Sequence, residues 1–460
     1  ARESTLWLHI LTIKEGINIY DQKLVAYANQ AHGPLDPIFK LFIHKILFFL
    51  EPWQVSRLNN LMLFLSIFLI NFLIFKKEHT IKLSLFISLT IYSLVYLLTK
   101  TFQGRADITA MLFISYLSYL CCDKNYYKKN INLIFASFIF SLIIMTNWRF
   151  LPLCLAISLF PIIDSENIKN IFSKHKIFIV IKFFLYSVIP FFLILYLFFN
   201  LELKKYFDYF IGFFYFGESF FTLEHFYQGL RHVIRVEKIY FLIFLKFLYL
   251  LKFYKKEQIN FSYFLKILIT VLVFLSSLVS YLYNYVGGGI YYFTPLIFFL
   301  WFQILYEQKN DHFYLNFKGK INILIIAISL IIILVSTKNS IRSYNFLKSG
   351  HKDSIILHEY LTELNLKNKN VLSESLHFHK KNYSGEKIDI GDLISYRASQ
   401  VGGEYEKTYL SHLKDLKDLK FDYIVHNFTG SQIINDLIKS NQYKIVKKFD
   451  KNVSNIGDIL

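Results

Sequence analysis

Residues 76–129 decide the fold, and they read KKEHTIKLSLFISLTIYSLVYLLTKTFQGRADITAMLFISYLSYLCCDKNYYKK. It holds two long apolar runs, 81–99 and 108–122, of the kind that form membrane-spanning helices. Lys residues gather at its two ends, whereas the loop 100–107 between the runs is poor in Lys. Because Lys and Arg concentrate in cytoplasmic loops, we predict a helical hairpin whose connecting loop lies outside the cytoplasm.

The same alternation continues along the chain and predicts an α-helical polytopic membrane protein with about ten visible transmembrane helices. Lys-rich loops at 76–82, 123–130, 164–176, 252–260 and 307–320 alternate with Lys-poor loops at 100–107, 146–148 and 287–289. The first set is expected on the cytoplasmic side. The predicted spans are 58–75, 81–99, 108–122, 131–145, 149–163, 177–199, 239–251, 261–286, 290–306 and 321–336.

This topology divides the chain into three regions. Residues 1–57 form a first outer loop with interfacial helices, 58–336 form the transmembrane domain with a long outer loop at 200–238, and 337–460 form a soluble outer domain. Because residue 1 falls outside, we expect one more helix or a cleaved signal upstream of Ala1. The C-terminal domain is predicted to lie outside the cytoplasm.

Composition excludes several classes of protein. Hydrophobic residues make up 54% of the chain, with 50 Phe and 33 Tyr, which is too apolar for one soluble domain of 460 residues. The net charge of +18 sits beside apolar spans, so it favours membrane lipids as partners and not nucleic acid. The three Cys show neither disulfide nor metal-ligand spacing. No cofactor is predicted, although the sequence is compatible with a bound divalent metal.

Within the first outer loop, residues 38–50 suit a helix that lies in the membrane interface. Lys40, His44 and Lys45 fall on one side of such a helix, and the Phe, Leu and Ile side chains fall elsewhere. The loop is therefore expected to follow the membrane surface.

The outer tail reads as a small α/β domain because its charge rises and its apolar runs shorten. The predicted elements are a helix at 354–366, strands at 371–372 and 421–426, a helix at 431–439 and a strand at 443–449.

Ionisable residues collect in the predicted outer loops, where a membrane protein avoids them unless they are used. The first loop contains Glu3, Asp21 and His32, and the loop before the third span contains Arg105 and Asp107. Asp107 stands at a helix start, so capping of the helix N–H groups is an equally good interpretation of that residue. Arg105 is the single Arg of a loop whose other cation, Lys100, stands at its edge, and it is harder to explain without a ligand.

Two further outer loops carry candidate binding residues. Arg231 and Arg235 stand four residues apart in the loop 200–238, a spacing that lets two guanidinium groups hold one phosphate. The alternative is an interfacial helix with a solvated basic face. Gly287-Gly288-Gly289 precedes Tyr291 and permits close approach of the backbone to a ligand, although a tight turn explains it equally well.

Five short motifs accompany this topology: an acid near the start of the first outer loop, Gly16-x-x-x-Tyr20-Asp21, His32-Gly33-Pro34-Leu35, Arg57-Leu58 and Gly104-Arg105-Ala106-Asp107. Together with the topology, they resemble the polytopic glycosyltransferases of the C-type (GT-C) fold, in particular bacterial relatives of protein mannosyltransferases and of the aminoarabinose transferases that modify lipid A. On this resemblance, the chain is expected in the bacterial inner membrane, with the C-terminal domain on its periplasmic side. The chain departs from the family in having Arg2-Glu3 where paired acids are common, and His-Gly-Pro-Leu where two prolines are common.

The resemblance implies an inverting transfer of one sugar from a polyprenyl-phosphate donor to a lipid, glycan or protein acceptor. The base would be Glu3, with Asp21 as its rival, and Arg105, Arg231 and Arg235 would hold the donor phosphate. The Trp-Trp-Asp-Tyr-Gly run of oligosaccharyltransferases is absent from the sequence, which argues against transfer of whole glycans to Asn.

Two other classes of protein compete with this interpretation. A flippase or exporter of lipid-linked glycans would place cations in the middle of several spans or show an inverted repeat, and the sequence shows neither. A noncatalytic membrane subunit would bind a partner in a membrane complex through its tail. This class would be favoured if Glu3 and Asp107 could be replaced without loss of function.

The topology predicts that reporters fused after Lys129 and at Leu460 lie on opposite sides of the membrane. Green fluorescent protein should fluoresce at the first site, and alkaline phosphatase should be active at the second. If both fusions report the same side, the number of spans between them is wrong.

Overall fold

The structure is a computed structural model that describes part of the chain. The described residues are 35–50, 52–77, 79–99, 106–164, 172–199, 261–283, 293–310, 326–342, 371–373, 387–388, 414–426, 432–446 and 458–459, together with single positions and pairs at 10, 223–224, 227, 231, 345, 359–360, 363–364 and 369.

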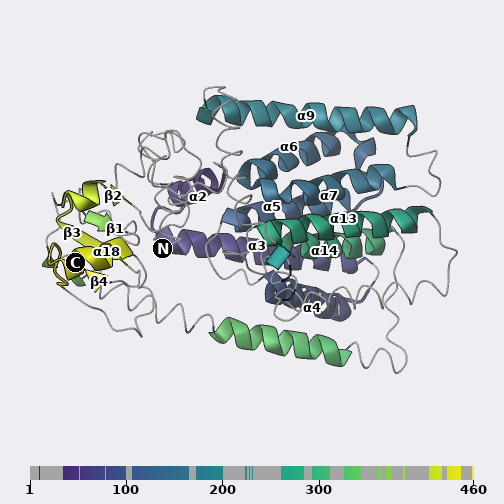
Figure 1. The fold of residues 1–460 in the computed structure, drawn as a ribbon. Coiled ribbons are helices and arrows are strands. Elements are labelled where there is room, and N and C mark those ends of the chain that lie inside the picture. The colour runs from purple at the N-terminus through teal and green to yellow at the C-terminus, as the bar shows by residue number, and fades with distance from the viewer. Residues whose placement is uncertain are drawn as a thin grey trace. The chain divides into compact units, whose positions relative to one another are not determined.

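The chain, which Figure 1 colours by residue number, separates into two compact units. One unit comprises residues 1–56, 202–216 and 340–460, and the other comprises 57–201 and 217–339. The first contains a helix of the N-terminal region and a small sheet, and the second is a bundle of helices.

Every predicted span that falls on described residues is helical, so the prediction of a helical chain is confirmed. The predicted span 239–251 lies outside the described residues. The helices of the bundle are α3 (Pro52–Phe75), α4 (Ile81–Thr99), α5 (Ala106–Cys121), α6 (Asn130–Thr146), α7 (Leu151–Ile163), α9 (Lys174–Phe199), α13 (Phe261–Tyr283) and α14 (Thr294–Asn310), with short 3₁₀ turns η1 (Tyr126–Lys128) and η2 (Trp148–Phe150), and a further helix over residues 326–342.

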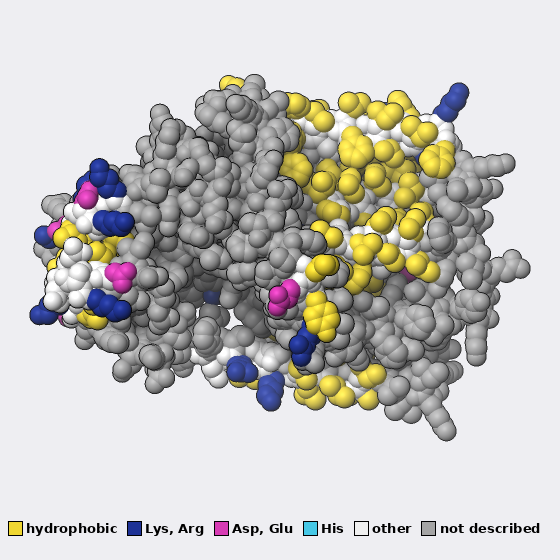
Figure 2. Space-filling model, viewed as in Figure 1, with side chains coloured by type: hydrophobic (Ala, Val, Ile, Leu, Met, Phe, Trp, Pro, Cys, Tyr) yellow, Lys and Arg dark blue, Asp and Glu magenta, His cyan; other side chains and the backbone are white. Residues whose placement is uncertain are grey.

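Two helices in the described part of the chain are long and apolar enough to cross a membrane, Arg57–Phe75 and Lys174–Leu197. Shorter apolar helices accompany them, among them Asn130–Thr146 and Leu265–Ser280. Figure 2 shows hydrophobic side chains gathered over the face of the bundle that includes α9. On α9 the side chains of Ile189 and Phe192 are 69% and 44% exposed. An apolar face of this extent fits surroundings of lipid better than water.

Hydrogen bonds between polar side chains connect the helices of the bundle. Asn59 of α3 donates to Thr109 Oγ1 of α5 at 2.8 Å. The Ser141 hydroxyl of α6 donates to the Ser187 carbonyl of α9 at 2.7 Å. In apolar surroundings a polar group must find its partner inside the protein, so these bonds select which helix faces pack together.

The ends of the bundle differ in their polar contacts. We name the Lys-rich end as the one where α5, α7 and α14 finish, and the Lys-poor end as the one where α3, α5 and α14 begin. At the Lys-rich end, Asn310 donates to the carbonyls of Cys122 and Tyr306, both at 2.7 Å, and accepts from the Lys124 N–H at 3.0 Å. The Tyr306 hydroxyl donates to Asp164 Oδ2 at 2.7 Å. These contacts tie the last turn of α14 to the ends of α5 and α7.

The sheet of the other unit contains β1 (Val371–Ser373), β2 (Lys387–Ile388), β3 (Tyr423–His426) and β4 (Asp458–Ile459) in the order β2-β1-β3-β4. β1 is parallel to β2 and β3, whereas β4 is antiparallel to β3. α18 (Gln432–Lys439) follows β3. The strands predicted at 371–372 and 421–426 and the helix predicted at 431–439 therefore lie where the sequence placed them, and Glu359, Tyr360 and Glu363 of the predicted helix 354–366 are helical.

The strand predicted at 443–449 is wrong over its described residues, 443–446, which carry no strand. Tyr443 closes the end of α18 instead: its N–H donates to Leu437 O at 3.3 Å, and its hydroxyl donates to Phe421 O at 3.0 Å. Burial raises the pKa of Tyr443, so the hydroxyl stays protonated as that bond requires. The fourth strand comes from the end of the chain, at Asp458–Ile459.

α2 (Leu35–Ile46) overlaps the interfacial helix predicted at 38–50, but it begins three residues earlier and ends four residues earlier. Of the predicted charged side, Lys45 is exposed, whereas Lys40 is 1% exposed and donates to Asp36, which is fully buried, at 2.9 Å. Because the buried carboxylate stands four residues earlier on the same helix, it neutralises the ammonium and allows Lys40 to be buried. The outward side of α2 is the apolar one, with Phe42 and Ile46 59% and 58% exposed.

Replacing Asn310 with Ala should lower the free energy of unfolding by about 1–3 kcal/mol, because buried backbone groups of α5 and α14 lose their partner. Denaturant titration in detergent micelles measures this change. The matched control is Asn125→Ala, since the Asn125 side chain is exposed in the adjoining loop. Equal stability of the two variants would show that Asn310 does not hold the Lys-rich end together.

Candidate functional site

The candidate site is a charged cluster at the Lys-poor end of the bundle, built around Asp107 in the first turn of α5. Asn147 ends α6 in extended conformation, with φ −162° and ψ 113°. Its side-chain oxygen then accepts from the Arg149 backbone N–H at 3.0 Å, which starts η2. A capping Asn between two helical segments thus positions both its own amide and the Arg149 side chain.

Both side chains converge on one carboxylate oxygen. Asn147 Nδ2 donates to Asp107 Oδ1 at 2.6 Å, and a terminal guanidinium nitrogen of Arg149 lies 3.0 Å from the same oxygen. Asp107 is 1% exposed and Arg149 is 12% exposed. The Arg149 guanidinium also lies 5.1 Å from the centroid of the Phe150 ring, which is buried. The guanidinium is therefore held in one place, next to an apolar wall.

A buried ion pair is costly to keep unless its geometry is good and further hydrogen bonds support it. Here the Asn147 amide supplies such support by donating to the carboxylate. The Asp107 carboxylate therefore accepts a hydrogen bond from Asn147 and forms an ion pair with Arg149. This is more than the helix cap that the sequence left open for Asp107, and it makes Asp107 a positioning residue for Arg149.

A further polar contact extends the Lys-poor end toward α3. Asn59 is fully buried, and its amide donates to Thr109, which stands two residues after Asp107 on α5. α3, α5, α6 and η2 thus all contribute polar side chains to this end of the bundle. The Asn59–Thr109 bond joins helix faces, whereas ionisable residues inside membrane-spanning helices, such as Asp107, are candidates for a functional role.

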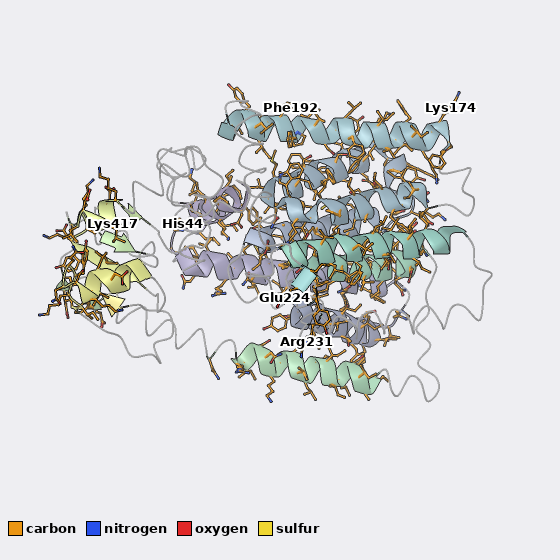
Figure 3. The ribbon with its side chains drawn as sticks, viewed as in Figure 1. His44, Lys174, Phe192, Glu224, Arg231 and Lys417 are labelled. Carbon is orange, nitrogen blue, oxygen red and sulfur yellow. The ribbon has the colours of Figure 1, made fainter. Side chains whose placement is uncertain are left out.

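Of the site residues predicted from the sequence, the structure describes Asp107 and Arg231. Asp107 lies in the cluster, and Arg231 is exposed and helical; Figure 3 labels it together with Glu224, which is exposed as well. The others, Glu3, Asp21, His32, Arg105, Arg235 and Tyr291, lie outside the described residues. Asp107 is thus the one predicted residue that the described contacts join to other polar side chains.

Sequence reasoning missed Asn147 and Arg149. It treated 146–148 as a short Lys-poor connection and started the next span at Arg149. The signal was present, because a lone Arg between two apolar runs requires a partner, and an Asn at a helix boundary is a capping residue. What the sequence lacked was the pairing with Asp107, which is 40 residues away along the chain.

Comparison with known proteins assigns no family: no protein-family model, curated protein or solved structure matches the chain. Among the described residues, no group of three or more His, Cys, Asp or Glu side chains could hold a metal ion.

Replacing Asp107 with Ala should destabilise the protein by about 3–5 kcal/mol, because the Arg149 charge is left buried without its carboxylate. Asp107→Ala/Arg149→Ala should cost clearly less than the sum of the single changes. A double-mutant cycle, measured by denaturant titration in micelles, gives this coupling energy.

The control cycle uses Lys309 and Asp123, a more exposed pair 3.5 Å apart at the Lys-rich end. Its coupling should be about 0–1 kcal/mol. Equal coupling in the two cycles would show that the Asp107–Arg149 pair is no stronger than a surface contact.

Proposed function

We propose that this protein is an inverting glycosyltransferase of the GT-C type, which transfers one sugar from a polyprenyl-phosphate donor to a lipid, glycan or protein acceptor. The observation that carries the proposal is the buried Asp107–Arg149 pair with Asn147, at the end of the bundle where the predicted loops are poor in Lys. A guanidinium fixed beside an apolar wall suits the phosphate of a lipid-linked donor, whose tail needs apolar surroundings.

In the proposed reaction, the acceptor hydroxyl oxygen attacks the anomeric carbon of the donor sugar. The bond from that carbon to the phosphate oxygen breaks, and the polyprenyl phosphate leaves with the electron pair. Glu3 takes the proton of the acceptor hydroxyl, with Asp21 as the rival base. Arg149, paired with Asp107, joins Arg105, Arg231 and Arg235 in stabilising the charge on the departing phosphate, and His32 and Tyr291 line the substrate site.

The proposal places the reaction at the outer face of a bacterial inner membrane. About ten membrane-spanning helices would hold the donor at the correct depth. The tail from residue 337 onward would form a periplasmic α/β domain, which is available to an acceptor or to a partner in a membrane complex. The alternation of Lys-rich and Lys-poor loops supports this orientation.

Glu3→Gln should reduce sugar transfer by about 10²–10⁴-fold and leave donor binding unchanged, because Gln keeps the size of Glu but takes no proton. The assay supplies the purified full chain with a panel of polyprenyl-phosphate sugars and measures the sugar released from the lipid.

Arg231→Ala should weaken donor binding, and Arg231→Lys should restore it only in part, since Lys lacks the two-pronged donor geometry of Arg.

The matched control is Glu359→Gln, which makes the same change at an exposed residue and should leave transfer unchanged. Near wild-type transfer by Glu3→Gln, together with inactive Asp21→Asn, would make Asp21 the base. If neither substitution matters and no donor is consumed, the protein is a noncatalytic subunit of a membrane complex.

A further inference from the structure

The end of α2 carries a surface patch that the sugar-transfer proposal does not use. Phe42 and Ile46 are 59% and 58% exposed, and Phe48 and Phe49, in the turn that follows the helix, are 80% and 68% exposed. The Phe48 and Phe49 rings meet edge to face, with centroids 6.0 Å apart. We call these four side chains the apolar patch.

The charges of α2 are arranged so that they do not compete with the patch. Asp36 and Lys40 neutralise each other on the buried side of the helix. Lys45 is the exposed cation of the segment and stands beside Ile46. The outward surface is therefore apolar with a single flexible ammonium, which can extend toward an anionic group while its carbon chain stays in apolar contact.

The chain itself limits where the patch can lie. α3 begins at Pro52, and the part of it that is apolar enough to cross a membrane begins at Arg57. Three residues of extended chain and five of helix keep Phe49 within about 20 Å of Arg57. If α3 crosses the bilayer, the patch lies within about 20 Å of the point where α3 enters it, which is within reach of the membrane surface.

We propose that the apolar patch inserts into the phospholipid leaflet at the Lys-poor end of α3, with Lys45 at the level of the lipid phosphates. Aromatic side chains gain from this boundary region because they pack against acyl chains without leaving a charge buried. The occupant of the patch is thus bilayer lipid. This inference is independent of the sugar-transfer proposal, because it requires only that α3 spans the membrane.

Spin labels test the proposal in the full chain reconstituted into lipid nanodiscs. Phe48→Cys and Phe49→Cys each introduce one reactive thiol, since the native Cys121, Cys122 and Cys154 are buried. Power saturation compares collisions of the label with oxygen, which concentrates in lipid, and with a water-soluble nickel chelate. At both sites the ratio of oxygen to nickel collisions should exceed the ratio of an aqueous control by several-fold.

The controls are Phe192→Cys on the apolar face of α9 and Lys417→Cys at an exposed position of the C-terminal region, both labelled in Figure 3. The patch labels should behave like the first control. Ratios equal to the second would show a patch in water, and low collision rates with both reagents would show a patch covered by protein or by a second copy. Either result overturns the proposal. If Phe48→Cys or Phe49→Cys does not elute from a size-exclusion column as the wild type does, Ile46→Cys is labelled in its place.

Discussion

The described bundle depends on α14 and on the hydrogen bonds that its polar side chains make to other helices. Trp301 donates to Asn71 of α3 at 2.9 Å, Gln303 donates to Thr270 of α13 at 2.9 Å, and Tyr306 donates to Asp164 after α7. Nearly all of α14 is buried. Because water cannot replace these partners inside an apolar bundle, each bond determines which face of a neighbouring helix turns toward α14.

This arrangement gives the two ends of the bundle different properties. At the Lys-rich end, short contacts join α14 to the ends of α5 and α7, and Lys266 lies 4.0 Å from Glu307 of α14, whereas the Lys-poor end holds the closer and more deeply buried Asp107–Arg149 pair. A buried pair contributes little net stability compared with apolar packing, so its presence is better explained by a requirement for charge at that position. A rigid bundle is also the support that a binding site needs to hold a guanidinium in one orientation.

A residue of the site could be predicted from the sequence only where the interacting residues are close together along the chain. Asp107 was identified because a charged residue at the start of an apolar run is visible within a few residues. Arg149 was not, because its significance depends on the packing of α5 against α6. The burial of Lys40 was missed for a similar reason: helical periodicity placed it on a polar side, and the charge of Asp36 was not counted as its partner.

The sequence by itself determined where the helices of the bundle lie and that the tail contains strands, because apolar periodicity and turn residues act over a few neighbouring positions. It also determined the alternation of Lys-rich and Lys-poor loops on which the proposed orientation rests. Only the tertiary structure decided that α14 lies inside the bundle, that Asp107 holds Arg149, and that α2 turns its apolar side outward. These features depend on which residues from distant segments become neighbours, and the packing of whole helix faces selects them.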